Sequence, residues 1–171
     1  MKNLKIHLVF GLFIISLFLP QASFAYETTK QSALRINDNT VLYTITYRFG
    51  FLNREVYMPI GAVRGLANAS TSPYLGYDIL DNGKATSTGK TSALVLSKAS
   101  IKNNQYFLPE GKVADFTLVT IVTLPKEMSE EGKNMALKVN HLPFIMVKDK
   151  SAGRTYLNER ELEPYISPEA K

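Results

Sequence analysis

Residues 40–49, TVLYTITYRF, alternate between two kinds of side chain. One side of the stretch consists of apolar and aromatic residues: Val41, Tyr43, Ile45, Tyr47 and Phe49. The other side includes the polar residues Thr44, Thr46 and Arg48. Because successive side chains of a strand point to opposite faces of a sheet, this alternation predicts a half-buried β-strand.

Turn-forming residues flank this strand on both sides. Residues 37–39 (NDN) precede it, and Asn and Asp form side-chain turns and tolerate left-handed backbone. We therefore expect residues 32–36 to pair back on the strand as a hairpin. Residues 50–54 should then reverse the chain into residues 55–63, where Pro59 removes a ladder donor and favours an edge or a bulge.

Further short apolar runs follow, separated by turn residues and without a long helix. They cover residues 77–80, 93–97, 101–108, 113–124 and 135–147. The run at 113–124 is apolar on both faces, so it should lie centrally in a sheet. The pattern predicts an all-β, antiparallel β-sandwich, immunoglobulin-like or jelly-roll-like, with at most one short C-terminal helix at residues 159–162.

Residues 1–25 have the three parts of a secretory signal peptide. Lys2 and Lys5 give a positive start, residues 8–19 (LVFGLFIISLFL) are apolar, and Ser23 and Ala25 suit a cleavage site after residue 25. The apolar run is shorter than the roughly 20 residues that cross a bilayer as a helix. We expect residues 26–171 to be one secreted or periplasmic domain without stable membrane insertion, with residues 26–31 loosely attached.

Composition argues against several classes of function. Cleavage would remove Lys2 and Lys5 and no acidic residue, so the formal net charge of +5 falls by two. The remaining basic residues form no run, which disfavours binding of nucleic acid. The chain has no cysteine, and His141 is the histidine left after cleavage. Zinc sites and catalysis that draws on several Cys or His side chains are therefore disfavoured, and we expect no cofactor.

Residues 78–83 (DILDNG) allow two interpretations. Asp78, Asp81 and Asn82 offer oxygen ligands for Ca²⁺ near Gly83, but the spacing is not that of an EF-hand. Asp-Asn-Gly is also a strong hairpin signal, and we favour this plain turn. His141 is similarly ambiguous, since a lone histidine acts as a general base only with partners that the sequence does not place. A structural role for His141 is favoured.

Two groups of carboxylates could form the facing pair of a glycan-acting hydrolase. They are Glu127, Glu130 and Glu131 near Asp115, and Glu159, Glu161 and Glu163 in the tail. Nothing in their spacing selects a facing pair, so no catalytic residue and no metal ligand is assigned.

Aromatic residues crowd into a short stretch: Tyr43, Tyr47, Phe49, Phe51 and Tyr57. Three of them share the apolar face of residues 40–49, which favours packing in the core. Phe51, beside the expected turn, should be the most exposed. The sequence thus predicts a non-catalytic exported β-sandwich that binds an envelope or surface protein or a glycan, or is structural. The alternatives are a small secreted hydrolase, and a matrix or fibre subunit assembled by exchange of residues 26–30.

Overall fold

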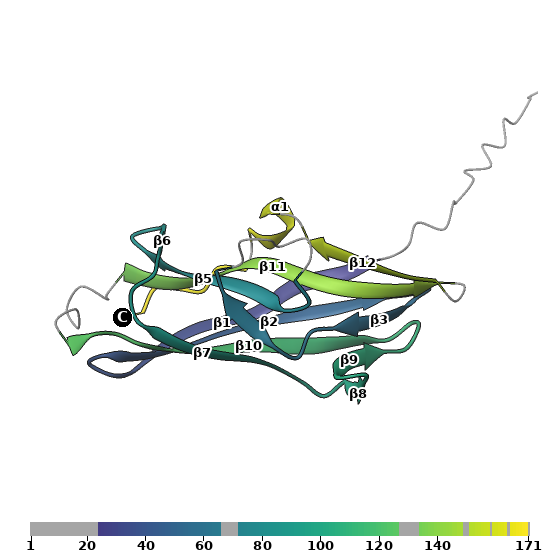
Figure 1. The fold of residues 1–171 in the computed structure, drawn as a ribbon, viewed down its shortest axis with the longest axis horizontal. Helices are drawn as coiled ribbons and strands as arrows, with labels where there is room; N and C mark the ends of the chain where they lie inside the picture. The colour runs from purple at the N-terminus through teal and green to yellow at the C-terminus, as the bar shows by residue number, and fades with distance from the viewer. Residues whose placement is uncertain are drawn as a thin grey trace, which may run out of the picture.

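The computed structural model describes residues 24–65, 72–126, 134–148, 151–157, 159–163 and 165–170. These residues form twelve β-strands and one short helix, α1 (Glu159–Leu162). The strands lie in two sheets that pack face to face (Figure 1). The predicted all-β sandwich is confirmed.

The first sheet has four strands in the order β1-β2-β10-β7, each antiparallel to its neighbour. Their bounds are β1 (Phe24–Asn37), β2 (Thr40–Phe51), β10 (Val113–Thr123) and β7 (Lys90–Ser97). The predicted alternation of residues 40–49 is confirmed, because its apolar side is buried against the second sheet. The predicted hairpin is also confirmed, and β1 is much longer than the expected partner strand.

The second sheet has the order β4-β5-β11-β3-β9-β8, with two more strands paired outside this path. Its strands are β3 (Glu55–Met58), β4 (Ala62–Arg64), β5 (Leu75–Asp81), β6 (Lys84–Thr86), β8 (Ser100–Lys102), β9 (Gln105–Leu108), β11 (Met135–Lys148) and β12 (Ser151–Leu157). β6 pairs with β5, β12 pairs with β11, and only the β4–β5 pair is parallel among the described strands.

The long strand β11 has different neighbours along its two halves. Its second half lies between β12 and β3, since Ile145 pairs with a residue of each. Its first half lies between β5 and residues 165–170, which we call the C-terminal segment, since Lys138 pairs with both Asp78 and Ile166. The C-terminal segment therefore completes the sheet where β3 ends.

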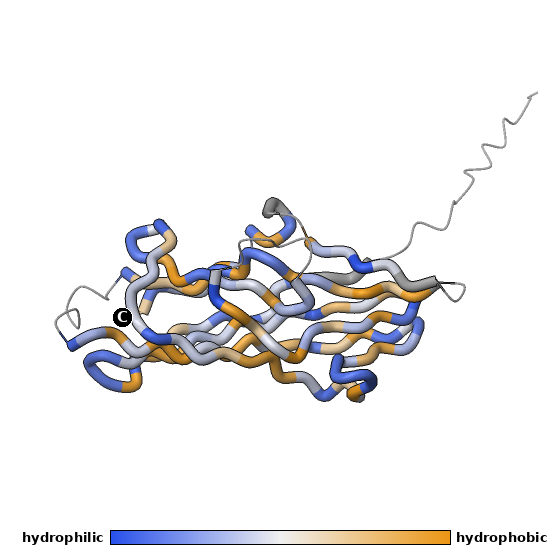
Figure 2. Tube along the Cα trace, viewed as in Figure 1, coloured by the Kyte–Doolittle hydropathy of each residue, from blue (hydrophilic) through white to orange (hydrophobic). Residues whose placement is uncertain are grey.

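Aromatic side chains dominate the interior between the two sheets. The ring of Tyr47 stacks on Phe116 and meets Tyr165 edge-on, at centroid distances of 5.7 and 5.6 Å. Tyr43 donates a hydrogen bond to the carbonyl oxygen of Met135 at 2.9 Å. Burial raises the pKa of Tyr43 to about 12, partly offset by Arg35, so this hydroxyl keeps its proton. Figure 2 shows apolar positions recurring along the strands and hydrophilic residues in the turns.

Three local expectations were wrong. Residues 26–31 are not loose but lie in β1, where Tyr26 pairs with Phe49 and Gln31 with Ile45. Phe51 is buried rather than exposed, because β2 continues through Gly50 and places Phe51 against Phe49 and Phe144. β3 is not an edge strand, since it lies between β11 and β9 and ends before Pro59.

The N-terminal signal peptide stays a prediction, because residues 1–23 lie outside the described residues. In the part of the chain that the structure describes, no helix has the length and apolar character needed to span a membrane.

The close approach at Gly50 gives a test of the packing. A Cβ added there would overlap the carbonyl oxygen of Lys112 and lie 2.8 Å from the Cα of Val113. We expect Gly50→Ala to lower the free energy of unfolding by about 1–3 kcal/mol, as overpacking does elsewhere. Gly153→Ala is the matched control, since its Cβ would meet no atom within 4 Å. Equal denaturant midpoints for the two variants would contradict the described packing.

Candidate binding face

The side chains of the first sheet that point away from the core form what we call the outer face. The register of the four strands arranges these side chains in rows across the sheet. In chain-register order the rows are Glu27, Arg48 and Asp115; Lys30, Thr46, Thr117 and Leu96; Ser32, Thr44, Val119 and Leu94; and Leu34, Leu42, Ile121 and Ser92. The outer face is thus polar at one end and becomes aliphatic toward the other end and toward β7.

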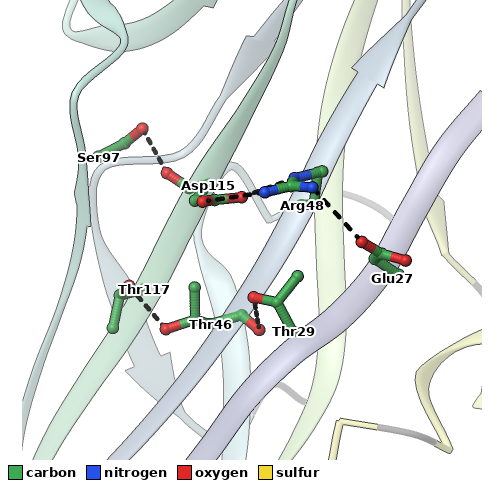
Figure 3. A network of polar contacts seen from close by, with 7 residues as sticks. All are labelled: Glu27, Thr29, Thr46, Arg48, Ser97, Asp115 and Thr117. Atoms are coloured by element: carbon green, nitrogen blue, oxygen red, sulfur yellow. Dashed lines mark hydrogen bonds and ion pairs between the residues drawn. The ribbon is translucent and has the colours of Figure 1, made fainter.

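The polar part of the outer face is held by contacts among its own side chains (Figure 3). The Arg48 Nε donates to Asp115 Oδ1 at 3.0 Å, and its Nη1 lies 3.7 Å from Glu27 Oε1. The hydrogen bond to Asp115 raises the pKa of Arg48. The Thr46 and Thr117 hydroxyls are 2.9 Å apart. These charges are paired on the surface, so they contribute little to stability and none is poised for proton transfer.

The aliphatic part of the outer face is exposed to solvent. We call it the aliphatic patch and define it as Leu34, Leu94, Leu96 and Ile121, whose exposed fractions are 59, 46, 52 and 41%. Val119 and Leu42 lie between them in the same rows and are half-buried. Contiguous exposed apolar side chains on a sheet face mark interaction surfaces more often than isolated ones do.

A hollow of about 770 Å³ borders the polar end of the outer face. It lies where β7 leaves β10, and its walls include Arg48, Asp115, Lys98 and Pro109. The aromatic ring lining it, Phe107, is covered by the Lys102 ammonium 3.5 Å from the ring centroid. Asp115 is the carboxylate of the lining and is bonded to Arg48. The hollow therefore has neither a facing carboxylate pair nor an open aromatic surface for a sugar ring.

His141 lies in the second sheet, at the point where the pairing of β11 with β5 shifts register. Its side chain is buried, and its ring is 5.3 Å from that of Tyr156. Neither ring nitrogen has a hydrogen-bond partner among the described residues. Burial lowers the pKa of His141, the nearby backbone of Ser72 opposes this, and the charge of Arg154 adds to it. A neutral, enclosed imidazole without an orienting acid is typical of a structural histidine.

The two carboxylate groups weighed as catalytic do not come together in the described structure. Asp115 lies on β10 of the first sheet, whereas Glu161 and Glu163 lie at α1, which packs on β11 of the second sheet. Glu127, Glu130 and Glu131 fall outside the described residues, as does the side chain of Glu159. Among the described residues no three His, Cys, Asp or Glu side chains are grouped so as to hold a metal ion.

The oxygen-rich stretch at residues 78–83 forms the predicted hairpin turn. Asn82 and Gly83 have positive φ angles of 48° and 77°, as the turn between β5 and β6 requires. Asp78 accepts a hydrogen bond from the Asn140 amide at 2.8 Å, and Asp81 accepts one from Asn82 at 3.0 Å. The two carboxylates are thus engaged with side-chain amides rather than with each other.

The aliphatic patch was missed by the sequence reasoning, although a signal for it was present. Residues 113–124 are apolar on both faces, and we took this as a sign of a central strand. β10 is indeed central in its sheet, between β2 and β7. In a two-layer sandwich, however, the second apolar face of a central strand has no layer to cover it, so it indicates an exposed patch.

His141 predicts a specific pH dependence of stability. Its ordinary pKa is 6.5 and its pKa in the folded protein is lower, so the unfolded state binds more protons between these two values. The free energy of unfolding should therefore fall as pH drops below about 6.5, by at most about 1.4 kcal/mol per pH unit from this group. His141→Leu should remove this component. Denaturant titrations between pH 7 and 5 that give parallel curves for the two proteins would contradict the assignment.

Comparison with known proteins adds no relationship: no protein-family model matches the chain, and no curated protein matches it in sequence.

Proposed function

We propose that this protein is an exported, non-catalytic β-sandwich that binds another protein of the cell envelope or surface through its outer face. The observation that carries the proposal is the aliphatic patch, in which four aliphatic side chains between 41 and 59% exposed lie in adjacent rows of one sheet. A protein partner is favoured because aliphatic side chains on a flat sheet face complement other apolar protein surfaces.

Two features favour a protein over a glycan as the partner. Sugar rings are commonly held against open aromatic faces, and the outer face carries aliphatic side chains instead. The ring beside the hollow, Phe107, is already covered by Lys102 and contacts Tyr57 at 5.1 Å. The outer face therefore suits burial against a protein better than stacking against a sugar.

The alternative of a small hydrolase has less support. His141 is buried, and Asp115 is paired with Arg48, so neither is free to act on a substrate in the hollow. Assembly through exchange of residues 26–30 also has less support, since those residues already pair with β2 over the length of β1.

Export gives the first test of this proposal. The signal-peptide features of residues 1–25 predict that the protein recovered from its natural host begins at Tyr26. Cleavage there would remove Phe24 and Ala25 from β1 and leave the pair of Tyr26 with Phe49 as the first of the sheet. N-terminal sequencing of protein from a periplasmic or extracellular fraction is the measurement. Recovery of the intact chain from the cytoplasm would contradict export.

Photo-crosslinking gives the second test. A photo-reactive amino acid at Leu94 should join the protein in its host to one defined partner, because Leu94 lies inside the aliphatic patch. The same residue placed at Tyr156 is the matched control, since Tyr156 is 47% exposed but lies on β12 of the second sheet. Identical products at the two positions, or none at Leu94, would contradict binding through the outer face.

A further inference from the structure

The C-terminal segment is held to the rest of the molecule through one strand. Val139 donates a hydrogen bond to the carbonyl of Tyr165 at 3.0 Å, and Ser167 donates to the carbonyl of Leu137 at 2.8 Å. Ala170 donates to the carbonyl of Met135 at 3.0 Å. All three bonds go to the first half of β11, so the segment can leave without breaking the pairing of any other strand.

The place that the segment occupies beside β11 cannot remain empty at low cost. Tyr165, Ser167 and Ala170 are all buried, and the ring of Tyr165 lies against Tyr47 in the core. The Ser167 hydroxyl accepts a further hydrogen bond from the Leu137 amide at 2.8 Å. Without the segment, the backbone groups of residues 135–139 would lose their partners beside an exposed core. Departure of the segment therefore requires a replacement of the same shape and hydrogen-bonding pattern.

The connection to the segment adds little that would hold it to its own chain. After β12 ends at Leu157, the described part of the connection is the single turn of α1, whose Leu162 is buried. Helices this short have no stability of their own and depend on packing. An element formed by α1 and the C-terminal segment thus carries its contacts with it, and the same sequence in another molecule makes the same contacts.

We propose that residues 159–170 exchange between two copies of this chain, each copy placing its C-terminal segment beside β11 of the other. The closed monomer and the exchanged dimer contain the same bonds to β11, so concentration decides between them. The partner is a second copy, because the only sequence seen to satisfy residues 135–139 in the described structure is this one. The inference is independent of the binding proposed for the outer face.

Two positions in this region suit a disulfide test. Lys138 and Ile166 are directly opposite each other, and the bonds on either side of them join residues 139 to 165 and 167 to 137. This is the pattern of a non-hydrogen-bonded antiparallel pair, whose Cα atoms are about 4.5 Å apart, within disulfide range. Both side chains are partly exposed, and the natural chain has no cysteine to compete.

The experiment mixes two single variants, K138C and I166C, at concentrations from micromolar to millimolar, and oxidises them after equilibration. Exchange predicts a disulfide between position 138 of one chain and position 166 of another, detected as a heterodimer by mass spectrometry, in a fraction that rises with concentration. A closed monomer cannot form this linkage. The double variant K138C/I166C is the control, since a disulfide within one chain shows that the pair can form and that the fold is intact. If that control closes but the mixture gives no linkage between positions 138 and 166 at any concentration, the proposal is wrong.

Discussion

A two-layer sandwich has one interior, and each of its sheets can bury only one face. In the first sheet this constraint sends Tyr43, Tyr47 and Phe116 inward and leaves the side chains of the alternate positions in solvent. Where those positions are polar, as in the row of Arg48 and Asp115, the side chains bond to each other. Where they are aliphatic, no layer covers them. The aliphatic patch is therefore a consequence of the fold rather than of a local irregularity.

The sequence predicted the elements that rest on local patterns. The alternation of residues 40–49 identified a strand and its buried side, and the Asp-Asn-Gly signal identified the turn at Asn82 and Gly83. Both depend on neighbouring residues alone. Side-chain alternation also correctly placed Tyr43, Tyr47 and Phe49 in the core.

Features that depend on distant partners could not be predicted in the same way. Phe51 is buried because Phe144 lies across from it, and the two residues are far apart in the sequence. The place of Tyr165 against Tyr47 is of the same kind. The aliphatic patch is intermediate, since each strand showed its apolar outer positions, but their juxtaposition needed the register of β2, β10 and β7.

The chemistry of the described residues is consistent with a molecule that acts by contact. The charges of the outer face are paired, and His141 is enclosed. What is left unpaired there is apolar area, and apolar area gains free energy when it leaves water, by about 25 cal/mol per Å². A partner that covers Leu34, Leu94, Leu96 and Ile121 would bring the outer face into the same condition as the core.

Hydroxyl-radical footprinting tests this account most directly, because it measures the solvent exposure of individual side chains. The labelling of Leu34, Leu94, Leu96 and Ile121 would be compared between the purified domain and the protein in intact cells of its host, with Tyr74, 53% exposed outside the patch, as the reference. The account predicts strong labelling of all five in the purified domain and selective loss at the four patch residues in cells. Equal labelling of the patch in both states would contradict binding through the outer face.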